Sequence, residues 1–292
     1  MGLGEPLRFA CFFANLTMPC AIVLFFTSPQ PLVPGPVRVL GQPAIVLHAT
    51  RWRETSLLIE LFTHEHGRIG AVARGVQGAK KQPLRAALQP MQRIRVDYLQ
   101  RGELAQLHHA EANGQVPALA GDALLAGFYL SELALRLLPR NDAHPLLFLR
   151  FAQALDELSD TPSLAWTLRR FERDLLDALG YAFDLQRDAV DAPLDADARY
   201  RIDPERGALR VRDGTGASRD SIAGAALLAL AEDATPSDAL LREQRIALRA
   251  VIAHHLGTRG LRSWGMLAEL ARLGPAAGDA AGTASGEAQG NG

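Results

Sequence analysis

The sequence predicts an α+β protein: a small five-stranded barrel followed by an all-helical domain that carries a small irregular insertion. Two patterns support this. From residue 43 to 112, short apolar stretches alternate with turn residues, as in closely spaced β-strands. After Pro117 the apolar residues recur at three- and four-residue intervals, which indicates helices. With 292 residues, 48% of them apolar, the chain is long enough for two hydrophobic cores.

Five segments of the first region are expected to be strands. They cover residues 44–50, 56–63, 67–75, 88–99 and 102–112. Five short strands in about 70 residues match the size of a small closed barrel, for which the OB-fold is the standing candidate. The connection "THEHGR" is short enough for a tight turn, and Gly67 can supply the positive φ that such a turn may require.

Helices are expected in the second region. Three long ones cover residues 117–139, 144–158 and 162–180, and three more cover 219–233, 237–257 and 261–273. Pro139 stops the first helix, whereas Pro145 and Pro162 stand in first-turn positions where proline is tolerated. Gly180 ends the third helix.

These elements divide the chain into four parts. An apolar leader covers residues 1–36, the OB-fold domain 37–114, the helical domain 115–273 and a tail 274–292. The helical domain contains an acidic, turn-rich insertion at 182–217, in which "ARYRI" and "ALRVR" are weak strand candidates. The tail has too few large apolar groups to offset its ordering entropy, so we expect it to be disordered.

The leader contains an 18-residue apolar run, residues 9–26, which Asn15 and Pro19 interrupt. It can be read as a signal peptide, as a marginal membrane helix, or as a non-native extension ahead of a translation start near Val37 or Val39. We favour the last interpretation because the run fits the targeting templates poorly. The only cysteines, Cys11 and Cys20, lie in this leader, which fits a reducing cytoplasm.

Charge is unevenly distributed along a chain whose net charge is only -1. From Arg38 to Ala110 there are 11 lysines and arginines against 5 acidic residues, and from Glu111 onward 19 against 26. A basic domain followed by an acidic one suggests a polyanion as the partner of the first. An ordinary solvated surface remains the alternative.

The loop "ARGVQGAKK" favours the polyanion. Gly75 and Gly78 let a ligand approach the backbone, and basic side chains surround the same point. No Walker A motif is present, so phosphate-backbone binding is favoured over nucleotide hydrolysis. Trp52 is the candidate for base stacking, although it could equally cap the barrel core. The predicted DNA-binding residues are Arg51, Trp52, Arg53, Arg68, Arg74, Lys80, Lys81, Arg85, Arg93 and Arg95.

Motifs for catalysis are missing. The chain has no G-x-S-x-G elbow, no H-E-x-x-H and no dinucleotide fingerprint. His64 with His66, and His254 with His255, lack a third ligand at a recognisable spacing, so a metal hydrolase is only a third, weaker option. We therefore expect neither an enzyme nor a cofactor.

Four segments of the sequence resemble segments of the bacterial recombination mediator RecO family. They are the opening "RETSLLIELF", the strand pair "HGRIGAVARG", the helix "GFYLSELALRLL" and the segment "LRRFERDLLDALGY". The likeness is good from residue 43 to about 185 and weak elsewhere. It implies an OB-fold joined to a helical domain, and binding of single- and double-stranded DNA. It also implies annealing of strands coated by single-strand-binding protein, contact with the acidic C-terminal tail of that protein, and RecA loading with RecR.

The resemblance has one departure and one further consequence. Some relatives carry a four-cysteine zinc module where residues 183–214 of this chain hold no cysteine, so no structural zinc is expected. An acidic peptide with an apolar end would need a hydrophobic groove rimmed by arginines, with an ordinary helix surface as the alternative. The candidates are Arg136, Arg140, Arg150, Arg169 and Arg170. The second-ranked function is a membrane-tethered scaffold anchored by residues 9–26.

Overall fold

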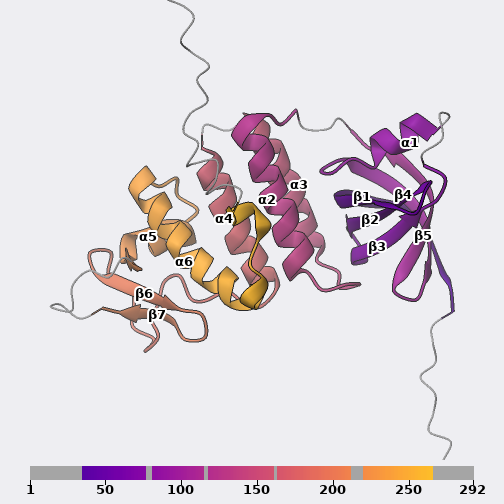
Figure 1. Ribbon diagram of the computed structural model, residues 1–292. Helices are drawn as coiled ribbons and strands as arrows, with labels where there is room; N and C mark the ends of the chain where they lie inside the picture. The colour runs from indigo at the N-terminus through magenta and orange to yellow at the C-terminus, as the bar shows by residue number, and fades with distance from the viewer. Residues whose placement is uncertain (1–34, 77–80, 115–117, 161–162, 212–219, 266–292) are drawn as a thin grey trace, which may run out of the picture. The chain divides into compact units, whose positions relative to one another are not determined.

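The protein is described here by a computed structural model, which covers residues 35–76, 81–114, 118–160, 163–211 and 220–265 (Figure 1). All of these residues belong to one compact unit, 35–292. The predictions for the tail, for the apolar run and for nearly all of the leader fall outside the described residues.

The first region forms a closed five-stranded barrel. Its strands are β1 (Val37–Trp52), β2 (Ser56–Thr63), β3 (Gly67–Ala73), β4 (Arg93–Arg101) and β5 (Leu104–Ala112), in the order β1-β2-β3-β5-β4. The β3–β5 pair is parallel and the other pairs are antiparallel, which confirms the OB-like barrel. The first half of β1 pairs with β4 and the second half with β2. Register shifts after Val39 and Val46 bend β1 between these partners.

A helix occupies part of the predicted fourth strand. The strand was expected from residue 88, but α1 (Gln82–Ala87) lies there and β4 begins only at Arg93. Ala87 and Leu88 are buried in the barrel core, and Leu84 packs against it. Positions 84, 87 and 88 have helical spacing, a signal that the strand prediction overlooked.

The second region is built on four long helices and one short one. They are α2 (Gly121–Leu137), α3 (Pro145–Asp160), α4 (Leu164–Ala178), α5 (Gly224–Ala231) and α6 (Asp238–Leu256), followed by the 3-10 turn η2 (Gly257–Arg259). The hydroxyl of Ser163 accepts from the backbone N–H of Trp166, and the hydroxyl of Ser237 accepts from that of Leu240. These caps fix where α4 and α6 begin.

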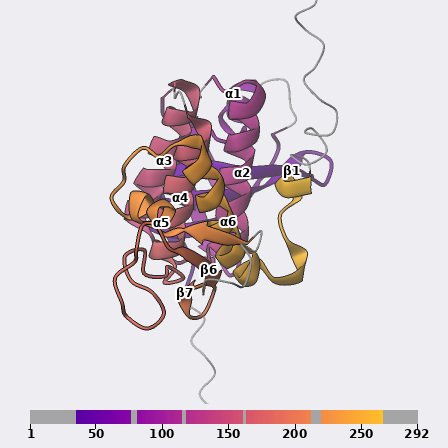
Figure 2. The same ribbon diagram turned by 90° about the vertical axis from the view of Figure 1, so that its left-hand side faces the viewer.

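The insertion is more regular than the sequence predicts. Both strand candidates are strands, β6 (Arg199–Asp203) and β7 (Gly207–Arg210), and β8 (Ser221–Ala223) completes a sheet of order β7-β6-β8. β6 and β8 contact α6, and Figure 2 shows β6 beside this helix. Glu243 of α6 accepts hydrogen bonds from Arg199 (2.6 Å) and from the backbone N–H of Ala223 (2.7 Å). Polar contacts therefore attach this sheet to the helices.

The barrel and the helices share part of their apolar core. Phe62 of β2 is fully buried among helical residues, and its ring lies 5.5 Å from that of Phe148 and 6.1 Å from that of Phe151. Both contacts are edge-to-face, a geometry that aromatic pairs prefer. The two parts that the sequence separates thus pack as neighbours.

A buried carboxylate reinforces this contact, and we call it the Glu60 junction. Glu60 of β2, whose side chain is only 12% exposed, binds the guanidinium groups of Arg68 and Arg140. Arg68 also donates to the carbonyl of Leu138 (2.9 Å), and the backbone N–H of Asn141 donates to the carbonyl of Arg68 (2.9 Å). The loop after α2 is therefore held against β2 and β3.

Glycine at position 67 is required by this close approach. A Cβ there would lie 1.7 Å from the carbonyl oxygen of Asp142, at a φ of +64°. Gly102, in the β4–β5 turn, has nearly the same φ of +68° but nothing within 4 Å of its Cβ position. The two glycines thus differ in the contact and not in backbone conformation.

We expect Gly67→Ala to lower the free energy of unfolding more than Gly102→Ala does. Both substitutions incur about 1–2 kcal/mol for the left-handed backbone, but only the first forces the docked loop away, which adds about 1–3 kcal/mol. Urea denaturation of the two variants measures the difference. Equal losses would show that the loop is not docked on β3.

Candidate nucleic-acid interface

Basic side chains gather where β1 turns into β2. Arg51 and Trp52 end β1, and Arg53, with a φ of 56°, turns the chain. The carbonyl of Thr55 accepts the backbone N–H of Val76 (2.8 Å), which brings the loop after β3 against this turn and places Arg74 next to it. We call Arg51, Trp52, Arg53 and Arg74 the basic turn cluster. All four side chains are exposed.

The loop after β3 adds further charge. Lys81 is exposed at the beginning of α1, and Arg85 is half-buried in its last turn. Lys80 and Gly78 lie outside the described residues. The loop therefore brings the charge of Lys81 and Arg85 to the segment that follows the basic turn cluster.

The positive charge of this surface is not neutralised within the described part of the chain. No carboxylate there lies within 4 Å of Arg51, Arg53 or Arg74, and the same holds for Lys81 and Arg85. Trp52 is 42% exposed and belongs to neither core cluster, which argues against the core-capping alternative. An exposed indole between unpaired guanidinium groups suits a ligand with phosphates and flat rings.

Arg68 and Arg93 do not belong to this surface. Arg68 is bound to Glu60, and Arg93 donates to the carbonyl of Ala152 (2.6 Å) and pairs with Asp156 (2.6 Å). Both arginines join the barrel to the helical region, so we revise their predicted role from DNA contact to structure. Arg140 covers Gly70 on β3 and thereby occupies part of the strand face that OB-folds commonly use for oligonucleotides.

Arg95 lies apart from the basic turn cluster. Its partner on β1 is Pro43 and its partner on β5 is Glu111, whereas Arg51 lies at the far end of β1. Arg51 follows Pro43 by eight residues of β1, which is about 26 Å at about 3.3 Å per residue. Arg95 therefore cannot reach the same nucleotide as Arg51.

Two of the five arginines predicted to bind a partner are engaged in ion pairs within the protein, one at the surface and one buried. Arg140 belongs to the Glu60 junction. Arg169 is only 5% exposed and binds Glu172, which also accepts from the hydroxyl of Tyr129 (2.6 Å). Arg169 cannot rim a surface groove, so the prediction for this residue is wrong: its charge is buried beside that of Glu172. Arg140 remains partly exposed, and its predicted role stays a prediction.

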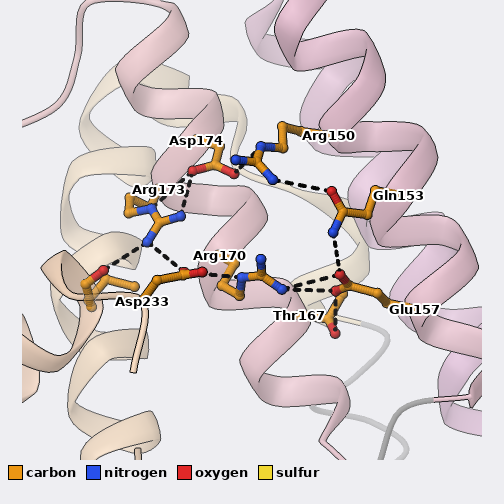
Figure 3. A network of polar contacts seen from close by, with 9 residues as sticks. Arg150, Gln153, Glu157, Thr167, Arg170, Arg173, Asp174 and Asp233 are labelled. Carbon is orange, nitrogen blue, oxygen red and sulfur yellow. Dashed lines mark hydrogen bonds and ion pairs between the residues drawn. The ribbon is translucent and has the colours of Figure 1, made fainter. Parts of the chain in front are cut away.

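Arg150 and Arg170 lie in a charged network on the surface of α3 and α4 (Figure 3). Arg170 donates to Glu157 (3.2 Å) and Asp233 (3.1 Å). Arg150 lies 3.6 Å from Asp174, which also pairs with Arg173. Only about 10 Å³ is open between these side chains. We call this set, with Gln153 and Thr167, the α3–α4 network; it has no preformed groove.

Two exposed leucines precede this network on α3. Leu146 is 79% exposed and Leu149 is 53% exposed. Their spacing from Arg150 and Gln153 places all four on one helix face. The combination of apolar and cationic groups at one surface is what an acidic peptide with an apolar end would need.

Arg136, the fifth candidate, lines a cavity between the barrel and α2, which we call the β1–α2 groove. Its volume is about 490 Å³. Leu47 and His48 of β1 form one wall, Phe128, Leu135 and Arg136 of α2 another, and Arg262 contributes from the C-terminal side. This groove was not foreseen, because it combines residues from strands and helices far apart in the sequence.

Glu132 of α2 fixes one wall of the β1–α2 groove. Its carboxylate accepts the backbone N–H groups of Arg262 (2.8 Å) and Ser263 (2.9 Å). Burial alone would raise the pKa of Glu132, but these hydrogen bonds and the charge of Arg136 hold that pKa below its ordinary value. The carboxylate therefore contributes to stability above its ordinary pKa, and this contribution is lost as pH falls through the lowered pKa.

The other two alternatives are a metal site and a membrane anchor, and the anchor predicted at residues 9–26 lies outside the described residues. Within the described ranges, no three histidine, cysteine or acidic side chains are arranged to hold a metal ion. His64 and His66 lie in the β2–β3 turn, whereas His254 and His255 end α6. None of the helices in this part of the chain is both long and apolar enough to cross a bilayer.

Comparison with known proteins gives a consistent result. A family model described as "Recombination protein O N terminal" matches residues 38–115, and one described as "Recombination protein O C terminal" matches residues 119–265. The chain is 57% identical to the "DNA repair protein RecO" of Xanthomonas euvesicatoria pv. vesicatoria over 229 residues, which are 78% of this chain and 95% of the relative. It is 55% identical to the protein of that name from Stenotrophomonas maltophilia strain R551-3 over 227 residues, 77% and 95% of the two chains.

We expect Arg169→Ala to lower the free energy of unfolding by about 3–5 kcal/mol, because it leaves the buried carboxylate of Glu172 without its cation. The double variant Arg169→Ala, Glu172→Gln removes that charge but keeps an acceptor for Tyr129, so it should recover part of the loss. Urea denaturation measures both.

The exposed pair of Arg187 with Asp191 provides the matched control, since Arg187→Ala should cost no more than about 1 kcal/mol. A double variant no more stable than Arg169→Ala would contradict the importance of the buried charge.

Proposed function

The chain belongs to the recombination protein O family of DNA repair proteins, and from this premise we propose that it is a DNA-binding recombination mediator. In this proposal it anneals single strands coated by single-strand-binding protein and, with RecR, assists the loading of RecA. Such work would place it at the nucleoid in the cytoplasm. It requires charge neutralisation and a way to hold strands, and no catalytic group.

The basic turn cluster is the observation that carries the proposal. Arg51, Arg53 and Arg74 present unpaired charges around the exposed ring of Trp52, on the connection between β1 and β2. OB-folds use that connection for oligonucleotides. These guanidinium groups would displace the counterions that are condensed on the phosphates of the strand. The indole would stack on a base of a single strand.

Double-stranded DNA can use the phosphate contacts but not the stacking. Because backbone contacts carry no sequence information, the surface would accept any two complementary strands. That tolerance is what an annealing protein needs. Lys81 and Arg85 extend the same charge along α1.

We further propose that the acidic tail of single-strand-binding protein binds the exposed face of α3. Leu146 and Leu149 offer apolar contact, and Arg150 and Arg170 offer charge. Carboxylates of the peptide would take the places that Asp174 and Glu157 hold in the α3–α4 network. Such an exchange of like groups gives little net gain from charge, so the leucines would supply most of the affinity.

We expect the triple variant Arg51→Ala, Arg53→Ala, Arg74→Ala to bind single-stranded DNA at least tenfold more weakly. The slope of log affinity against log salt should fall by about 2, since each phosphate contact on a single strand contributes about 0.7. Fluorescence anisotropy across a salt series measures both quantities. The control is Arg187→Ala, Arg201→Ala, Arg206→Ala, which removes the same charge from the insertion. Equal weakening in both triples would show a net-charge effect instead of a site.

We expect Leu149→Asp to weaken binding of the C-terminal peptide of single-strand-binding protein by about tenfold and to slow annealing of strands coated by that protein. Annealing of bare strands should not change, since Leu149 lies outside the barrel. Val190→Asp, at an exposed apolar residue of the insertion, is the control. Normal peptide binding by Leu149→Asp would show that the peptide does not bind this face of α3.

A further inference from the structure

The β1–α2 groove holds an aromatic ring that packing does not account for. Phe128 is 40% exposed, whereas its neighbours on α2, Gly127 and Tyr129, are buried. Phe128, Leu47 and Leu135 line a cavity of about 490 Å³. A cavity lined by large apolar side chains and a few charged groups is the usual form of a ligand site.

Within the described part of the chain, the arginines around this groove are not held in ion pairs. Among the described residues of the helical region, eight other arginines lie within 4 Å of a carboxylate; they are Arg140, Arg150, Arg169, Arg170, Arg173, Arg187, Arg199 and Arg210. Arg136 and Arg262 have no such partner among the described residues. Arg136 donates only to the carbonyl of Gly260 (3.2 Å). Two guanidinium groups without an ion pair thus flank the groove in the acidic part of the protein.

The carboxylate of Glu132 also lines the groove and offsets part of this charge. Glu132 directs its two oxygens to the backbone N–H groups of Arg262 and Ser263. With two guanidinium groups against one carboxylate, the groove has a net positive lining and remains suited to an anion.

The groove is continuous with the basic turn cluster through β1. His48 lines the groove, and its ring nitrogen lies 2.7 Å from the hydroxyl of Thr50 on the same strand. Alternate residues of a strand share a face, so His48, Thr50 and Trp52 follow one another along the outer surface of β1. From His48 to Trp52 the distance along the strand is about 13 Å at about 3.3 Å per residue.

We propose that the β1–α2 groove is a second site for single-stranded nucleic acid, where a base stacks on Phe128 and phosphates contact Arg136 and Arg262. A strand held at the basic turn cluster continues along β1 into the groove. This proposal rests on the proposed function, because it extends the same ligand. Continuity along β1 favours a polymer of repeating phosphates and rings over a short acidic peptide, which has no reason to follow the strand.

The test is the binding of two oligonucleotides of equal length to the full chain, one ordinary and one with abasic sites. Phe128→Ala should weaken binding of the ordinary oligonucleotide about fivefold to a hundredfold, the range found for loss of one stacked base. It should change binding of the abasic oligonucleotide less than twofold. Anisotropy measures both affinities, and thermal unfolding checks that the variant is folded.

Two further variants separate the contribution of base stacking from that of the charged groups. Phe128→Trp should retain tight binding, since an indole also stacks. The double variant Arg136→Gln, Arg262→Gln should lower the salt slope by about 1.4 on both oligonucleotides. Val190→Ala, an exposed apolar truncation in the insertion, should change neither affinity.

The outcomes distinguish the groove from the proposed function. If Phe128→Ala binds the ordinary oligonucleotide normally while the triple variant of the basic turn cluster does not, the groove proposal is overturned and the DNA-binding function stands. If Phe128→Ala weakens only the peptide of single-strand-binding protein, the groove is a peptide site and the proposal is again overturned. If the unmodified protein binds neither oligonucleotide, the proposed function itself fails.

Discussion

The carboxylate of Glu60, held between Arg68 and Arg140, is the interaction on which the arrangement of this protein depends. It is largely removed from water, and loss of either arginine would leave a poorly solvated charge. The contact fixes the loop after α2 against β2 and β3, and with it the position of α2 beside β1. The β1–α2 groove exists because of this placement, since its walls come from these two elements.

Arginine has two roles in this chain, and the presence of a nearby carboxylate decides between them. Arg68, Arg93, Arg140 and Arg169 are held in ion pairs at junctions or in the core. Arg51, Arg53 and Arg74 have no such partner among the described residues and face solvent. In the acidic half of the chain, many carboxylates pair with arginines of the same half.

The three surfaces described here suit different steps of one process. In the functions proposed above, the basic turn cluster holds the backbone of a strand, the β1–α2 groove holds a base farther along, and α3 holds the protein that coats the strand. The α3–α4 network is neutral when nothing is bound, because its arginines already have carboxylate partners. A peptide that must displace these carboxylates gains little from charge and would therefore dissociate readily.

Local patterns in the sequence determined the five strands, the long helices and the two strands of the insertion, since periodicity and turn residues act over a few positions. They also placed Trp52 between two arginines on a connection. The tertiary structure alone decided which arginines remain free, because the partners of Arg140 and Arg93, Glu60 and Asp156, lie dozens of residues away in the chain. The same holds for the β1–α2 groove: no local pattern reports which strand a helix will face, and packing brings Phe128 to β1.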